Sequence, residues 1–155
     1  MDQQTHHAQR IHGFLGDVEH KLEQFFAKTP FHIPEPWRHN IAKISPWITL
    51  IVMILTLPLI LGALGLSIIS APVIEASGHS YGAWFWIGWV IILISLVIEA
   101  IALPKLFKLD IRGWRLVFWA NLLMVLFHIV DFSITGLIGD VIGLYILFEI
   151  KNQYH

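Results

Sequence analysis

Long apolar runs dominate the chain after residue 43, and they predict membrane-spanning helices. Residues 44–74 contain no ionisable side chain, whereas about 20 apolar residues are enough to cross a bilayer. We place a first span at residues 47–70. Three further apolar runs predict spans at residues 82–103, 113–130 and 134–150. The pattern therefore predicts an all-α integral membrane protein built as an antiparallel four-helix bundle.

The first 45 residues follow a different pattern. Apolar residues recur at steps of three and four between Thr5 and Lys28, which predicts an amphipathic helix. A proline-rich connector (29–36) and a short amphipathic lead-in (37–44) follow it, so we divide the chain into residues 1–45 and 46–155. The apolar face of the predicted helix consists of Ile11, Phe14, Leu15, Val18, Leu22, Phe25 and Phe26.

This N-terminal helix has two main interpretations. It lies on the cytoplasmic membrane surface, or it binds a protein partner. Its mixed charge weakens the first, because helices on membrane surfaces usually carry an excess of Lys and Arg. Pairing with a second copy is a third interpretation, and two heptads are short for a coiled coil.

Basic residues fix the expected orientation. Every Lys and Arg lies in residues 1–43, 105–115 or 151–155. Basic residues close to membrane-spanning helices stay in the cytoplasm. Because the three basic segments alternate with pairs of spans, we expect four crossings with both termini cytoplasmic.

Composition narrows the function classes. The chain has 56% hydrophobic and 14% charged residues, compared with roughly a quarter charged residues in soluble domains. Its net charge of -1 argues against nucleic acid as a partner. The absence of cysteine excludes disulfides and thiolate metal sites. No catalytic motif is present, so we expect a protein that is not an enzyme.

Polar side chains within the predicted spans are the candidate site residues, because each is costly in a bilayer unless it is paired. We expect Glu99 to pair with Arg115 or Arg112 near the cytoplasmic side. Near the outer side, His128 and Asp140 should lie at similar depth, as a register-fixing hydrogen bond or as a proton or ion site. The full candidate set is Glu99, Asn121, His128, Asp131 and Asp140.

Metal or haem ligation is the weakest alternative for these residues. His79 and His128 are the only candidate ligands we single out, and their spacing matches no known metal motif. We therefore predict no metal and no haem, and we expect lipid to be bound.

Small residues predict where helices approach closely. The candidates for helix contact are Gly62, Gly65, Gly136, Gly139 and Gly143. The tryptophans are expected mainly in the two interfacial belts, with Trp37, Trp47, Trp114 and Trp119 inside and Trp84, Trp86 and Trp89 outside. A stacked aromatic site for a pigment or quinone is the alternative for these tryptophans.

The last part of the chain carries one resemblance. Residues 137–151, LIGDVIGLYILFEIK, and the segment from Leu103-Pro104 to Gly113-Trp114 resemble the corresponding parts of small uncharacterised bacterial multipass membrane proteins. Their last helix reads I-G-x-x-I-G-L-Y-L-L-F-x-(I/V)-(K/R). The resemblance implies a bacterial cytoplasmic membrane and no particular activity. Asp140 and the long N-terminal helix have no counterpart in that group.

These observations together predict a small accessory or scaffold subunit of a membrane protein complex. Its partners would be other membrane proteins or copies of itself, bound through the glycine-rich helix faces and the N-terminal helix. A small oligomeric proton- or ion-coupled transporter is the first alternative. A redox subunit with a histidine-ligated cofactor is the second.

Overall fold

The computed structural model describes residues 16–28 and 32–155, and their regular structure is all helical. The chain divides into two compact units, Met1–Ile33 and Pro34–His155. In the first unit, residues 16–27 form a helix, as predicted for this stretch. Val18 and Leu22 are half-buried on it and Phe26 is buried, whereas Phe25 is exposed. Three other residues of the predicted apolar face lie outside the described residues: Ile11, Phe14 and Leu15.

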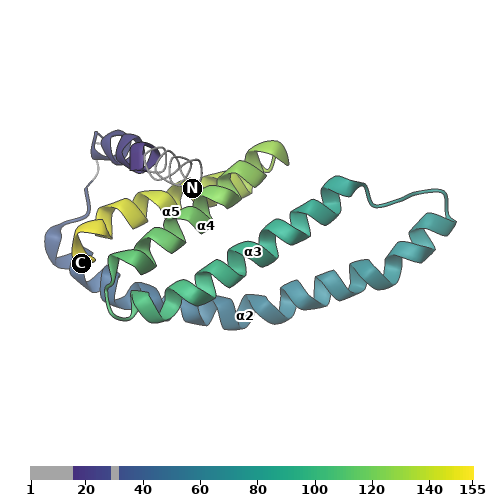
Figure 1. Ribbon diagram of the computed structural model, residues 1–155, viewed down its shortest axis with the longest axis horizontal. Coiled ribbons are helices and arrows are strands. Elements are labelled where there is room, and N and C mark those ends of the chain that lie inside the picture. Colours follow the sequence, from purple (N-terminus) through teal and green to yellow (C-terminus); the bar gives the residue numbers. More distant parts are fainter. Residues whose placement is uncertain (1–15, 29–31) are drawn as a thin grey trace, which may run out of the picture. The chain divides into compact units, whose positions relative to one another are not determined.

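The second unit contains four long helices and a terminal 3-10 turn (Figure 1). They are α2 (Glu35–Ala76), α3 (Ala83–Leu106), α4 (Ile111–Val130), α5 (Ile134–Ile150) and η1 (Lys151–Gln153). Among the described residues, α2, α3 and α4 are long and apolar enough to cross a membrane. Helix α5 has 17 residues and the same bounds as the fourth predicted span.

Helix α2 is much longer than the predicted span at residues 47–70. It begins at Glu35 and runs without a break to Ala76, so the predicted lead-in at residues 37–44 and the first span form one helix. Pro46 lies inside this helix and cannot donate to the carbonyl of Ala42. The Ser45 hydroxyl donates to that carbonyl instead, at 3.1 Å. A local side-chain hydrogen bond thus helps the helix to continue through the proline.

Three connections end their helices in the same way. In each, a residue with positive φ follows the helix, at Gly78 (84°), Leu109 (52°) and Phe132 (53°). The next residue then donates its N–H to a carbonyl five positions earlier, as Asp110 does to Lys105 and Ser133 does to His128. This is the Schellman ending, which favours glycine at the positive φ. Only the first connection has glycine at this position. The ends of the other two helices are therefore harder to predict from the sequence.

Helix α4 lies between α3 and α5 and makes most of its contacts with these two neighbours. Helix α2 has fewer contacts, with α3, α5 and η1. The largest fully buried side chains are Trp114, Phe118, Ile150 and Pro46. Trp114, which was expected in the inner belt, is packed inside the protein: its ring stacks on Phe118, and its Nε1–H donates to the carbonyl of Leu147 at 2.7 Å.

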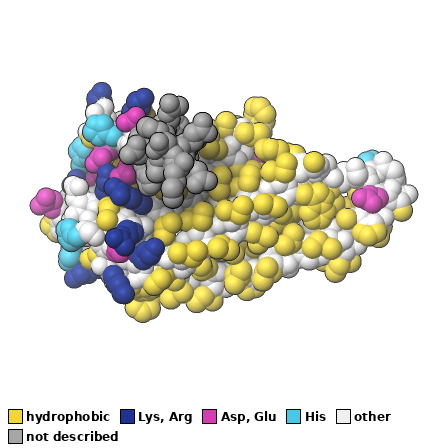
Figure 2. Space-filling model, in the orientation of Figure 1, with side chains coloured by type: hydrophobic (Ala, Val, Ile, Leu, Met, Phe, Trp, Pro, Cys, Tyr) yellow, Lys and Arg dark blue, Asp and Glu magenta, His cyan; other side chains and the backbone are white. Residues whose placement is uncertain are grey.

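Charge separates the two ends of the second unit. Lysines and arginines gather where α2 begins, where α3 connects to α4 and where the chain terminates, and the helices beyond them present a broad apolar surface (Figure 2). We call this the basic end. The opposite end, which contains the α2–α3 and α4–α5 connections, is the far end.

Side chains of the first turns of α2 hold the C-terminal segment at the basic end. The Arg38 guanidinium lies 3.0 Å from the carboxylate of Glu149. The Tyr154 hydroxyl donates to Ser45 Oγ at 3.0 Å, since the one proton of Ser45 is already committed to Ala42. Burial raises the pKa of the Tyr154 phenol above its ordinary value. These contacts join the start of α2 to the C-terminal segment within the second unit.

Candidate functional site

A histidine–carboxylate pair lies near the far end, between α4 and α5. His128 Nδ1 lies 2.6 Å from Asp140 Oδ2, a distance typical of a strong charge-assisted hydrogen bond. The two side chains are only 18% and 17% exposed. The structure therefore brings together two residues whose similar depth was expected from an antiparallel arrangement of neighbouring spans.

Gly136 forms the seat of the His128 ring. A Cβ at Gly136 would lie 2.6 Å from both Cδ2 and Nε2 of His128, which is closer than atoms without a bond can approach. The ring can reach Asp140 only because this position of α5 has no side chain. Nδ1 faces Asp140, and Nε2 lies close to the backbone of α5 at Gly136.

The pair lies where α4 ends, and His128 is in the last turn of that helix. Within residues 16–28 and 32–155, no three His, Asp or Glu side chains gather as a metal-binding group. His79, Glu75 and Asp131 therefore do not join the pair in such a group.

Asn121 lies two turns before His128, on the same side of α4. Its amide nitrogen would be 2.8 Å from a Cβ at Gly143, so this second glycine of α5 also receives a side chain of α4. Asn121 Oδ1 is buried and has no hydrogen-bond partner among the described residues, and the same is true of the hydroxyl of Ser95 on α3. A buried carbonyl oxygen and a buried hydroxyl without partners are energetically costly. Polar atoms thus lie in the packed interior formed by α3, α4 and α5.

The expected ion pair of Glu99 with Arg115 or Arg112 is not formed. Glu99 is half-buried on α3 and makes no hydrogen bond or ion pair with the described residues. An ion pair between two helices joins Glu149 of α5 and Arg38 of α2. Sequence reasoning missed it because the partners are far apart in the chain, and α2 reaches Glu149 only by extending to Glu35.

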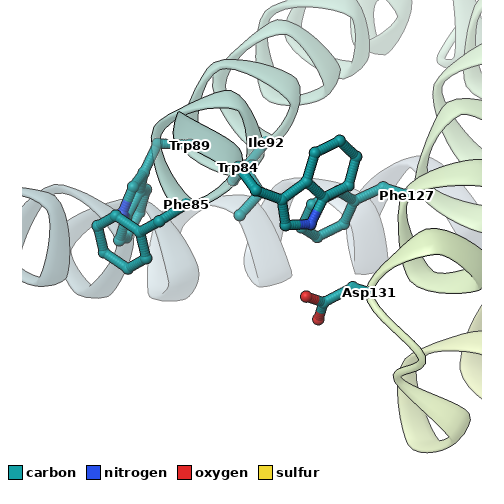
Figure 3. A pocket seen from close by; sticks show the side chains of 7 residues that line it. Trp84, Phe85, Trp89, Ile92, Phe127 and Asp131 are labelled. Atoms are coloured by element: carbon teal, nitrogen blue, oxygen red, sulfur yellow. The ribbon is translucent and has the colours of Figure 1, made fainter. Parts of the chain in front are cut away.

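A pocket of about 250 Å³ opens between the far halves of α3 and α4 (Figure 3). The Trp84 and Phe127 rings stack with centroids 6.3 Å apart, and Phe85 meets Trp89 edge to face at 6.3 Å. Tryptophans 84 and 89 were predicted as belt residues, and both also line this pocket. Its lining consists of Trp84, Phe85, Gly88, Trp89, Ile92, Phe127 and Asp131.

The remaining glycines of the predicted contact set are open. A Cβ at Gly62, Gly65 or Gly139 would meet no atom within 4 Å, outside the glycine's immediate neighbours and its own helix backbone. No side chain of a neighbouring helix therefore packs on these three glycines.

Comparison of the chain with protein-family models, with curated proteins and with solved structures found no match. Function must therefore be inferred from the chain's own residues. The resemblance of residues 137–151 to small bacterial membrane proteins stays a prediction.

Substitution of Gly136 tests whether the lack of a side chain at this position allows His128 to reach Asp140. In Gly136→Ala, the new methyl group must displace the His128 ring from Asp140, and overpacking of this kind costs about 1–3 kcal/mol. In the matched control Gly139→Ala, no atom opposes the methyl group, and better helix propensity makes the change neutral or stabilising by up to about 1 kcal/mol. Unfolding of both variants in the same detergent measures the difference. Equal stability of the two variants would contradict the packing of the His128 ring against Gly136.

Proposed function

We propose that the chain is a multipass protein of a cell membrane, and that it acts as a small accessory subunit that binds partner membrane proteins. The helix lengths support the membrane assignment. The confinement of Lys and Arg to one end supports four crossings with both termini cytoplasmic. The resemblance noted for residues 137–151 favours a bacterial cytoplasmic membrane.

Helix α5 is the shortest of the four proposed spans. Its 17 residues extend about 26 Å at a rise of 1.5 Å each, slightly less than a hydrocarbon core of about 30 Å. Local thinning of the bilayer accommodates a mismatch of this size. Antiparallel packing of α5 on α4 further supports its crossing as a partner of that helix.

One surface of α2 carries the proposed partner role. Its four most exposed large side chains are Leu59, Leu66, Ile69 and Val73, at 70–74% exposure. With the open Gly62, they recur at steps of three and four. This is the spacing of a seam along which a second helix packs, and a small residue within the seam lets the two backbones approach.

The length of α2 supports the same conclusion. Residues 44–74, which carry no ionisable side chain, extend about 46 Å at 1.5 Å per residue. A helix that exceeds the hydrocarbon thickness tilts, thickens the bilayer or associates with other helices. Lipid alone would cover the apolar seam, but the helix would still be longer than the hydrocarbon core is thick. A partner helix would cover the seam and also offset this mismatch.

Labelling of single cysteines tests the topology. The chain has no cysteine of its own, so one can be introduced at His79 or Phe132, at the far end, and at Lys108 or His155, at the basic end. We expect a membrane-impermeant maleimide to label the first two in intact cells and the last two only after permeabilisation. Labelling of residues 108 and 155 in intact cells would contradict the proposed orientation.

Photo-crosslinking tests the partner role. A photoreactive amino acid at Leu59, Leu66 or Ile69 should give a protein adduct of defined mass in native membranes. The matched control is Val97, an exposed apolar residue of α3, which should give lipid adducts. Lipid adducts alone from all four positions would contradict partner binding through α2.

The His128–Asp140 pair favours one alternative, a proton-coupled carrier, because a partly buried imidazole and carboxylate can share and release a proton. In proteoliposomes with an imposed potential, Asp140→Asn should then reduce proton flux at least about tenfold, since the buried imidazole loses its counter-charge. Glu75→Gln is the control, because Glu75 is an exposed carboxylate at the same end and lies outside the pair. Unchanged flux in Asp140→Asn, or no flux in the unaltered protein, would reject this alternative.

A further inference from the structure

The aromatic pocket at the far end has walls from two helices. Trp84, Phe85 and Trp89 come from the first turns of α3, and Phe127 comes from the last turn of α4. Gly88 lets the two walls meet, since a Cβ there would lie 3.0 Å from the Phe127 ring. The faces of aromatic rings carry partial negative charge, and several rings around one cavity attract a cation.

A carboxylate completes the pocket. Asp131 caps the end of α4, and its side chain points toward the space between the two aromatic pairs (Figure 3). Its carboxylate makes no hydrogen bond or ion pair with the described residues. No Lys or Arg occurs in residues 44–104 or 116–150, so the far halves of α3 and α4 supply no Lys or Arg to neutralise Asp131.

The size of the pocket limits the ligand. Sites for drug-sized molecules usually occupy about 300–1,000 Å³, whereas this cavity measures about 250 Å³. Aromatic walls disfavour a strongly hydrated inorganic ion and suit a cation that carries its own apolar groups. Quaternary ammonium groups bound in aromatic cages have this chemistry.

We propose that the pocket of Trp84, Phe85, Trp89, Phe127 and Asp131 binds a small alkylated ammonium cation, either as a free ion or as the headgroup of a lipid. The rings surround the alkyl groups and the Asp131 carboxylate balances the charge. This site goes beyond the proposed partner role of α2 and does not depend on it.

Calorimetric titration of the full chain in maltoside micelles tests the site. The probes are choline and dimethylbutanol, its uncharged isostere in which carbon replaces nitrogen. We expect choline to bind at least about tenfold more tightly than dimethylbutanol, as loss of a desolvated cation–π contact implies. Equal binding of the two probes, or no binding of choline, would overturn the proposal.

Two variants and a control locate the binding. Asp131→Asn and Trp84→Ala should each weaken choline binding about tenfold, whereas Glu75→Gln removes another exposed carboxylate of the far end and should leave it unchanged. Asp131 is exposed, so its variant keeps the fold, which circular dichroism checks. Choline affinity in Asp131→Asn equal to that of the unaltered chain would overturn the proposal.

Nanodiscs distinguish the two sources of the ligand. If a lipid headgroup is the natural occupant, phosphatidylcholine nanodiscs should weaken the binding of free choline relative to phosphatidylglycerol nanodiscs. If the ligand is a free cation, choline should bind equally in both. Each result supports the ammonium site, and binding of choline in neither lipid would overturn it.

Discussion

Close approach of α4 to its two neighbours is the constraint on which the rest of the structure depends. Inside a bilayer, apolar side chains gain little by leaving lipid, so helices associate mainly through close van der Waals contact and interhelical hydrogen bonds. Side chains of α4 meet this requirement by seating on glycines of α3 and α5. At the other end of α4, Gly113 allows its backbone to approach Lys105 and Leu106. The glycines in these contacts are Gly88, Gly113, Gly136 and Gly143.

The two candidate sites both follow from this arrangement. Phe127 and His128 are consecutive in the last turn of α4, so they point to different neighbours: Phe127 to Gly88 of α3 and His128 to Gly136 of α5. The aromatic pocket therefore forms on one side of the helix and the His128–Asp140 pair on the other. A shift of α4 along its axis would disturb the pocket and the pair together. Both sites at the far end therefore depend on how α4 packs.

Helix α2 is held in place differently, by contacts at its two ends. It is held at the basic end, where Arg38 pairs with Glu149 and Ser45 accepts from Tyr154, and at the far end, where the Ser70 and Tyr81 hydroxyls are 3.1 Å apart. Between these ends, its large side chains are mostly exposed. The helix thus combines fixed ends with an open apolar middle, which is the part that the proposed partner would cover.

Sequence alone determined the helical class, the extent of α3, α4 and α5 to within a few residues, and the proximity of His128 and Asp140. These features depend on local composition and on the antiparallel order of adjacent helices, both of which can be read along the chain. The length of α2 was underestimated, because prolines and a polar lead-in are boundary signals and only the structure shows Ser45 donating to the Ala42 carbonyl.

Tertiary structure decided which polar residues found partners. Glu99 has a suitable depth and charge for an ion pair with Arg115 or Arg112, but depth does not fix the side of the helix that a residue occupies. The pair of Arg38 and Glu149, the burial of Trp114 and the aromatic pocket depend on rotations and contacts between segments distant in sequence. Likewise, the glycines looked alike in sequence, and only packing separated Gly136 and Gly143, which seat side chains of α4, from Gly62, Gly65 and Gly139, which remain open. Periodicity specifies which residues share a face, whereas helix rotation and packing decide what that face meets.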